Sequence, residues 1–268
     1  MGKTNTPEFT LSFQTDNLVY GRTNNPFDTT RTPGGSSGGA AAIIAAGASP
    51  FDIGTDTGGS IRLPAHFSGI AGIKPTSGRV PCTGNALPSS GLLARLSQPG
   101  PMARYVEDLA LILEIISGPD NVDPYTVPAS LRPMAAVDVT GLRFGYHTDN
   151  GIRAASTDIR QVVMAACRLL QDAGVAVTEA RPDGLEMTNF IMSRIFSADG
   201  GEMVEALLAD CRTDTPSPRI SNSLTRRAPP IDQRDFAQVI NLWDNCRSSM
   251  LGYFDDFDIL ICPVNAHT

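Results

Sequence analysis

The chain has 268 residues, of which 41% are hydrophobic and 18% are charged, values typical of a globular protein with a substantial core. Its net charge of −7 argues against nucleic acid or an anionic membrane as a partner. It has no apolar run of the ~20 residues that a membrane helix needs, and its polar N-terminus lacks the apolar region of a signal peptide, so we expect a cytoplasmic protein.

The cysteines are odd in number and widely scattered, which favours reduced thiols over a disulfide framework. They are Cys82, Cys167, Cys211, Cys246 and Cys262. No cysteine or histidine pair has the spacing of zinc ligands, so no metal centre is expected. Candidate general bases are scarce, because the chain has only two lysines and three histidines. They are Lys3, Lys74, His66, His147 and His267.

The first predicted elements surround two glycine-rich loops. Residues 38–47 are mostly alanine and isoleucine, which predicts a closely packed helix. Because this helix follows directly on the first loop, the N–H groups of that loop should lie at the positive end of a helix dipole. Short strands are predicted at residues 51–55 and 70–74, the second ending at Pro75.

Residues 81–101 are rich in Gly, Pro and Ser, which predicts a loop. Apolar residues then recur at helical spacing from 106 to 116, and Gly118-Pro119 ends this helix. A connection rich in Pro and Asp is expected over residues 117–140.

The middle of the chain predicts a parallel βαβ unit. A strand is expected at residues 142–146, a helix with its apolar face between 159 and 173, and a second strand at 175–178. This strand–helix–strand order is typical of a parallel pair joined by a crossover helix.

The last third is predicted to be largely helical. One helix should span residues 187–209, with an interruption near Gly200-Gly201, and a polar, proline-rich loop should span 213–230. A long helix follows, with Trp243 expected in the core. Residues 258–263 predict an apolar strand of the fully buried kind.

The two glycine-rich loops are the most informative part of the sequence. Residues 31–40 read Arg-Thr-Pro-Gly-Gly-Ser-Ser-Gly-Gly-Ala, and residues 54–64 read Gly-Thr-Asp-Thr-Gly-Gly-Ser-Ile-Arg-Leu-Pro. Paired glycines let a backbone approach a ligand and turn its N–H groups inward. A serine in such a loop can combine a nucleophile with oxyanion donors. The alternative is an ordinary turn, the commonest role of Gly-Ser clusters.

Two other interpretations of the first loop fit poorly. A phosphate-binding loop requires a lysine after its last glycine, and neither lysine stands there. The nucleophile-elbow pattern Gly-x-Ser-x-Gly occurs at residues 34–38 and 35–39, but an elbow follows an apolar strand. Residues 28–33 are polar and end in proline, so we attribute this match to glycine density.

Taken together, the two loops closely resemble the amidase signature family. The similarity lies in Pro33–Ala40, Gly54–Pro64 and Gly69–Arg79, with Ser60 24 positions after Ser36. It continues through residues 2–9, 100–109 and 258–263 and therefore spans nearly the whole chain.

The resemblance implies a mixed α/β fold in which a largely central twisted β-sheet is covered by helices on both faces. It also implies one domain over residues 1–268, with a signature core at about 25–110 and a variable substrate-pocket region at about 117–250. No metal or organic cofactor is expected for this family.

In that family a Ser–cis-Ser–Lys triad hydrolyses amides. The resemblance makes Ser60 the nucleophile and Ser36 the bridging serine, whose peptide bond to Gly35 should be cis. The expected oxyanion hole consists of the N–H groups of Thr57, Gly58, Gly59 and Ser60.

Other loop residues are expected to support this site. Ser37 should hydrogen-bond within the network, beside Gly35. Asp56 and Arg62 are interpreted as a structural ion pair that holds the second loop rather than as reacting groups.

The triad lysine of the family precedes the segment that begins at Gly2, so we expect this chain to be an amidase fragment, truncated at both ends, that lacks this lysine. Lys3 and Lys74 fall in other motifs, and His66 is a local alternative base. A base must come within hydrogen-bond reach of the serine that it serves.

Two functional classes therefore stay open: an amidase that cleaves a small-molecule amide through a serine acyl-enzyme, and a catalytically impaired amidase-like subunit or binding module. A homodimer is a further option. Membership in a glutamine-dependent amidotransferase that works on aminoacyl-tRNA ranks last, because the chain is acidic and Leu63 follows Arg62 where glutamine is expected.

Overall fold

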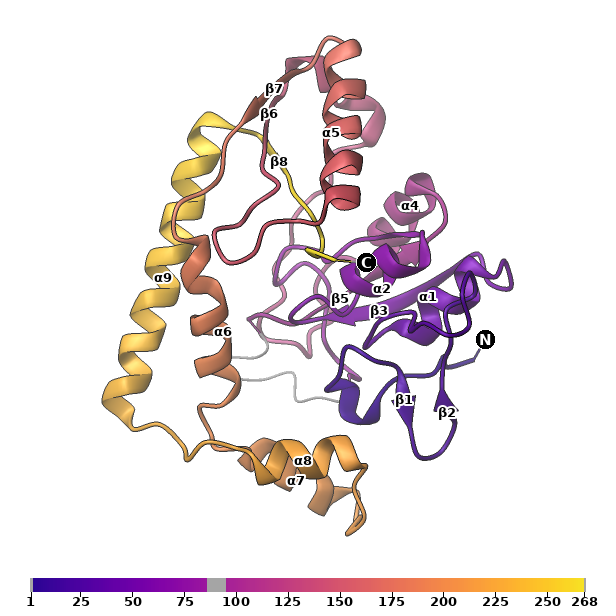
Figure 1. Cartoon of the computed structure of the whole chain (residues 1–268), viewed down its shortest axis with the longest axis vertical. Coiled ribbons are helices and arrows are strands. Elements are labelled where there is room, and N and C mark those ends of the chain that lie inside the picture. Colours follow the sequence, from indigo (N-terminus) through magenta and orange to yellow (C-terminus); the bar gives the residue numbers. More distant parts are fainter. Residues whose placement is uncertain (1, 86–94, 268) are drawn as a thin grey trace. The chain divides into compact units, whose positions relative to one another are not determined.

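The computed structural model describes residues 2–85 and 95–267 and divides into two compact units, Met1–Ala136 and Val137–Thr268 (Figure 1). Both units combine helices with strands, and the predicted mixed α/β class is confirmed. The elements of the first unit are η1 (Glu8–Thr10), β1 (Asp16–Asn17), β2 (Gly21–Arg22), α1 (Gly38–Ala45), β3 (Phe51–Asp56), α2 (Arg62–Ser68), β4 (Ala71–Gly72), β5 (Gln98–Ala103), α4 (Val106–Ile116) and η2 (Met134–Ala136).

Strand β5 is the main correction in the first unit, because it begins within the predicted loop 81–101. It is the central strand of an antiparallel sheet with the order β3-β5-β4. The carbonyl of Pro101 accepts a hydrogen bond from Ile73 N–H, 3.0 Å away on the β4 side. Since successive residues of a strand face opposite neighbours, Pro99 and Pro101 turn their nitrogens toward β4, which pairs over two residues only. The longer ladder with β3 therefore keeps its donors, and the prolines are tolerated.

The other predictions for this unit need smaller changes. The helices expected near residues 38–47 and 106–116 are present as α1 and α4, and the expected strand at 51–55 is β3. The strand expected at 70–74 shortens to β4. Residues 86–94 of the predicted loop lie outside the described residues.

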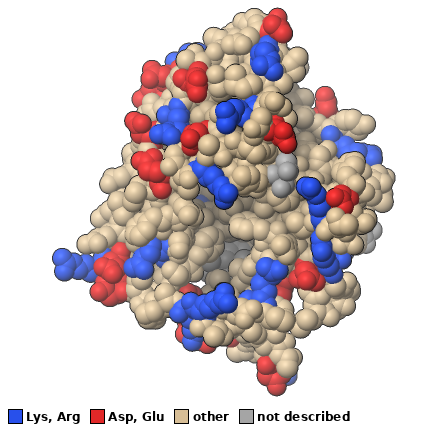
Figure 2. All heavy atoms as spheres, in the orientation of Figure 1, with Lys and Arg blue, Asp and Glu red and all other residues tan. Residues whose placement is uncertain are grey.

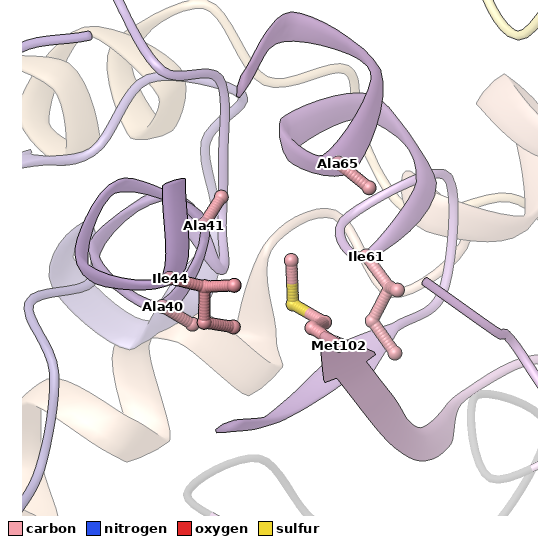
Figure 3. Close-up of a cluster of buried hydrophobic side chains, with 6 residues drawn as sticks. All are labelled: Ala40, Ala41, Ile44, Ile61, Ala65 and Met102. Atoms are coloured by element: carbon pink, nitrogen blue, oxygen red, sulfur yellow. The ribbon is translucent and has the colours of Figure 1, made fainter. Parts of the chain in front are cut away.

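A small apolar core lies between the two helices that follow the glycine-rich loops (Figure 3). Ala40, Ala41 and Ile44 of α1 face Met102 of β5, and Ile61 and Ala65 complete the cluster; all six are at most 5% exposed. The core therefore holds the residues immediately after both serine-bearing loops.

Gly100 marks the tightest backbone approach in this sheet. A β-carbon placed on Gly100 would clash with the carbonyl oxygen of Ile73 and lie 2.7 Å from Cδ of Pro75. Because neither the Ile73 backbone nor the Pro75 ring can easily yield, we expect Gly100→Ala to lower the free energy of unfolding by about 3 kcal/mol. Urea unfolding followed by circular dichroism would measure this loss.

Gly252 of the second unit provides the control for that substitution. Among the described residues, no heavy atom lies within 4 Å of a β-carbon placed there, and the residue lies inside a helix. Gly252→Ala should therefore stabilise that helix by about 0.5–1 kcal/mol. A Gly100→Ala protein as stable as the parent would contradict the close approach.

The second unit continues the alternation of strands and helices. Its elements are η3 (Val139–Gly141), β6 (Arg143–Tyr146), α5 (Thr157–Asp172), β7 (Ala176–Glu179), η4 (Leu185–Met187), α6 (Thr188–Phe196), α7 (Glu202–Asp210), α8 (Pro218–Thr225), α9 (Gln233–Asp256) and β8 (Ile259–Ile261).

The predicted parallel βαβ unit is confirmed, since β6 and β7 pair in parallel and the helix α5 connects them along the chain. Strand β8 pairs in parallel with the other edge of β6. The strand expected at 258–263 is present as β8, but the expectation that it is fully buried was wrong. β8 is an edge strand of this three-stranded sheet, and its residues are half-buried.

Helix α8 was also missed, because four prolines suggested a loop over residues 213–230. Ser217 caps this helix by accepting a hydrogen bond from Ile220 N–H, and Pro218 occupies its first turn, where no N–H is needed. The break between α6 and α7 falls at Gly200-Gly201, as predicted.

The long helix α9 lies alongside α6 (Figure 1), and Val239 is its buried residue. Trp243, expected in the core, is half-buried, with the guanidinium of Arg247 5.5 Å from its ring centre. Over the part of the chain that the structure describes, no helix has both the length and the apolar character needed to cross a bilayer.

Candidate active site

The first glycine-rich loop carries a cis peptide bond between Gly35 and Ser36, at the position expected from the sequence. Ser36 is 2% exposed. Thr15 holds this loop from outside, because its buried hydroxyl donates to Gly34 O at 2.9 Å and accepts from Gly38 N at 3.1 Å. The loop is thus fixed on both sides of the cis bond.

The N-terminus of α1 is occupied by protein groups. Gly38 N–H donates to the Thr15 hydroxyl, and Gly39 N–H donates to Asn5 O at 3.1 Å. These are two of the N–H groups that a helix start leaves without intrahelical partners. The N–H groups of Gly38 and Gly39 are therefore engaged within the protein.

Ser37 joins the two glycine-rich loops. Its backbone N–H donates to Ser60 O at 3.1 Å. Its hydroxyl accepts from Thr55 N at 3.3 Å and donates to Thr55 O at 3.4 Å. The segments that carry Ser36 and Ser60 consequently lie side by side, and Ser37 takes part in the hydrogen-bond network as predicted.

Asp56 organises the second loop from inside. Its carboxylate is 0% exposed and accepts hydrogen bonds from the N–H groups of Gly59 (2.7 Å), Ile61 (3.1 Å) and Arg62 (3.2 Å). The Arg62 side chain donates two more, from Nε at 3.0 Å and Nη2 at 2.8 Å, so the ion pair expected from the sequence is present.

These contacts also set the charge of Asp56. Burial raises the pKa of its carboxyl group, but the hydrogen bonds and charge of Arg62, with the N–H groups of Gly59 and Ile61, outweigh burial and hold the pKa below its ordinary value of 3.8. Asp56 is therefore an ionised anchor of the loop at neutral pH, which fits the structural role predicted for it.

One of the four expected oxyanion donors is already engaged. Gly59 N–H points at Asp56 Oδ1, 2.7 Å away, so this donor is turned into the loop. For Thr57, Gly58 and Ser60 the role of oxyanion donor stays a prediction. Ser60 is half-buried and stands just before α2.

Ser97 is a supporting residue that sequence reasoning missed. Its hydroxyl lies 2.6 Å from the hydroxyl of Thr57, and its carbonyl accepts from Cys82 Sγ at 3.6 Å. Gln98 donates to Val80 O at 2.8 Å. Ser97 precedes β5 directly, so a correct assignment of that strand would have placed it beside β3 and Thr57.

The candidate bases within the chain differ in their surroundings. Burial lowers the pKa of Lys74 below its ordinary value of 10.5; the Asp56 carboxylate opposes this shift, and the Arg62 guanidinium adds to it. Burial also lowers the pKa of His66, whose Nε2 has no hydrogen-bond partner among the described residues. His66 lies in the last turn of α2, and its ring centre is 5.6 Å from that of Phe67.

Comparison with known proteins identifies the family of this chain. The family profile described as Amidase matches residues 1–268. A glutamyl-tRNA(Gln) amidotransferase subunit from Chloroflexus aggregans is 42% identical over 182 residues, which cover 67% of this chain and 36% of that protein. The corresponding subunit from Bacillus velezensis is 41% identical over 183 residues, or 67% and 37%. The chain thus spans little more than a third of the length of these curated relatives.

Solved structures agree on the fold. A bacterial aryl acylamidase of the amidase signature enzymes superposes with a TM-score of 0.82 at 29% identity, over 99% of this chain and 56% of that one. A fatty acid amide hydrolase gives a TM-score of 0.85 at 24% identity, over 99% and 48%. With the family profile matched over residues 1–268 and the fold shared, this chain belongs to the amidase signature family.

Proposed function

We propose that this chain carries the nucleophilic half of an amidase site, in which Ser60 attacks an amide carbonyl and Ser36 receives its proton. The observation that carries the proposal is the hydrogen bond from Ser37 N–H to Ser60 O, which aligns the two serine-bearing segments beside the cis bond at Gly35–Ser36. Ser60 Oγ bonds to the carbonyl carbon, the C–N bond breaks, and the amine leaves with the proton that Ser60 gave up. Water then hydrolyses the acyl-enzyme and restores Ser60.

The negative charge that develops on the carbonyl oxygen is stabilised, in this proposal, by the N–H groups of Thr57, Gly58 and Ser60. One such donor typically contributes about 2.7–4 kcal/mol to the transition state. The hydroxyl pair of Thr57 and Ser97 supports this arrangement, since it fixes the first residue of the donor segment.

The base is assigned, through the family resemblance, to a lysine outside residues 1–268. Neither lysine within the chain takes that role in the proposal: Lys3 belongs to the Gly-Lys-Thr-Asn segment, and Lys74 follows β4 near the charges of Asp56 and Arg62. In the resting enzyme such a lysine is neutral, which burial among uncharged polar groups favours.

A fluorophosphonate probe tests this proposal on the protein that carries the base lysine, because the probe reacts covalently with an activated serine and its phosphoryl oxygen enters the oxyanion site. We expect one adduct, which peptide mass spectrometry assigns to Ser60. Failure of the protein to react, or an adduct on another serine, would overturn the assignment and favour the catalytically impaired, binding alternative.

The curated relatives favour a second candidate, the glutamine-hydrolysing component of an amidotransferase, which the sequence reasoning had ranked last. Both relatives described above carry an amidotransferase name, at 42% and 41% identity. Ammonia release from glutamine, compared with hydrolysis of a small panel of other amides, separates the candidates. Turnover of glutamine alone would favour the amidotransferase.

The distribution of surface charge indicates whether such a component would bind RNA directly. On the face shown in Figure 2, acidic and basic side chains are interspersed over the surface, and the net charge is −7. Proteins that bind nucleic acid directly usually gather lysine and arginine on one face. In this proposal the component handles the amide and another protein would contact the RNA.

A further inference from the structure

The hydroxyl of Ser97 connects the sheet to residues 57–60, the segment that carries the proposed oxyanion donors. Strands β3 and β5 pair in register as far as Asp56 and Gln98, so Thr57 and Ser97 are the next two residues opposite each other. Their hydroxyl oxygens lie 2.6 Å apart, and both residues are half-buried. Opposed side chains of an antiparallel pair contact each other directly. This hydrogen bond therefore ties the donor segment to the sheet at the point where β3 ends.

The backbone that carries the Ser97 hydroxyl is itself fixed. Cys82 Sγ donates to Ser97 O at 3.6 Å. The side chain of Gln98, which is 1% exposed, accepts from Arg79 N at 3.1 Å and donates to Val80 O at 2.8 Å. A side chain can position another group only when its own support is held by packing and hydrogen bonds. Ser97 meets this condition.

Thr57 lies between two separate anchors of the second loop. Ser37 bonds to the backbone two residues before Thr57. The Asp56 carboxylate accepts from Gly59 N, two residues after Thr57, at 2.7 Å. Removal of the Ser97 hydroxyl breaks neither anchor. Its loss should therefore change the position of the donor segment rather than unfold the loop.

We propose that Ser97 is a positioning residue for amide hydrolysis. Through the Thr57 hydroxyl, it holds the N–H groups of Thr57 and Gly58 where negative charge develops on the substrate oxygen. This inference rests on the proposed function of Ser60. Donors aimed at developing charge act chiefly in the transition state, so their displacement lowers the rate of the chemical step more than the affinity for substrate.

The test is fluorophosphonate labelling of Ser60 in the protein that carries the base lysine. Measuring the rate against probe concentration separates the maximal labelling rate from the affinity for the probe. We expect Ser97→Ala to lower the maximal rate about tenfold, since the donors shift rather than disappear, and to leave the affinity nearly unchanged. Ser97→Thr keeps the hydroxyl and should retain most of the rate. Equal maximal rates for Ser97→Ala and the parent would overturn the proposal.

A double-mutant cycle distinguishes positioning through Thr57 from a general loosening of the first unit. Thr57→Val removes the partner hydroxyl while nearly keeping the shape of the side chain. If Ser97 acts through that hydroxyl, adding Ser97→Ala to the Thr57→Val protein should slow labelling no further. A second loss of about tenfold in this background would contradict the route through Thr57.

Ser77→Ala is the matched control for Ser97→Ala. The Ser77 hydroxyl donates to Arg95 O at 2.8 Å, two residues before Ser97, so it holds the chain that leads into β5 and is no part of the hydroxyl pair. Its loss should leave the labelling rate unchanged. Urea unfolding followed by circular dichroism would check that every variant is folded.

Hydrogen exchange at the N–H groups of Thr57 and Gly58, followed by NMR, gives a readout that does not depend on labelling. Ser97→Ala should speed this exchange, because the segment loses its tether, and Ser77→Ala should not. Faster exchange in a protein whose parent is not labelled would overturn the proposed function of Ser60 alone. Labelling of the parent, with unchanged exchange and rate in Ser97→Ala, would overturn the role of Ser97 alone.

Discussion

Replacing Ser60 with alanine should abolish fluorophosphonate labelling, and replacing Ser36 with alanine should slow labelling of Ser60 by about 10²–10⁴-fold, the usual contribution of a positioned proton acceptor. Ser36 is 2% exposed and directly follows the cis bond, so no bulk water stands in for its hydroxyl. The measurement is the second-order rate constant of labelling, obtained from the time course of adduct formation.

Ser49→Ala provides the matched control for the Ser36 substitution. The hydroxyl of Ser49 donates to Phe51 O at 2.7 Å, in the connection between α1 and β3, and its loss should leave the labelling rate unchanged. If Ser36→Ala reacts as fast as the parent while remaining folded, Ser36 does not carry the Ser60 proton.

Asp56→Ala should destabilise the first unit by about 3–5 kcal/mol, the cost of removing one partner from a buried, hydrogen-bonded ion pair. The substitution leaves the N–H groups of Gly59 and Ile61 without their acceptor and leaves Arg62 without its counter-charge. The Arg62 side chain is 47% exposed, so water can solvate its charge once the carboxylate is removed. The loss of unfolding free energy should therefore be closer to about 3 than to about 5 kcal/mol. Urea unfolding at pH 7, followed by circular dichroism, would measure it.

The same carboxylate predicts how stability depends on pH. Its folded pKa lies below the ordinary value of 3.8, so the unfolded chain binds the proton more readily than the folded one. The stabilisation is therefore fully present above about pH 4 and is lost as the pH falls through the folded pKa. Asp56→Asn should remove this part of the acid sensitivity.

Asp28 provides a control for the stability measurements on the Asp56 variants. It is an exposed residue that pairs with Arg31 at 3.2 Å, and exposed pairs contribute little to stability. Asp28→Asn should leave the unfolding free energy at pH 7 nearly unchanged. Equal losses for Asp28→Asn and Asp56→Ala would contradict the buried anchor.

Local sequence patterns determined most of the helices and the positions of the two serines that are proposed to react. The apolar spacing from 106 to 116 and the stop at Gly118 define α4, and Gly200-Gly201 separates α6 from α7. These features could be predicted because helix periodicity, caps and breakers act between residues a few positions apart. The serine motifs are similarly short and specific, so Ser36, Ser60, Asp56 and Arg62 could be named from the sequence alone.

Tertiary structure decided which groups meet across long separations in the chain. Pro99 and Pro101 argued locally against a strand, and they fit into β5 only because their nitrogens face the side where the ladder is short. Ser97 reaches Thr57 across 40 residues, and Ser37 joins the two glycine-rich loops through its hydrogen bonds to Ser60 O and to the backbone of Thr55. Hydrogen-bond partners and side-chain exposure are set by neighbours that only the folded chain supplies. The sequence therefore determined the chemistry that the loops can carry, and the fold decided which of their N–H groups are engaged within the protein.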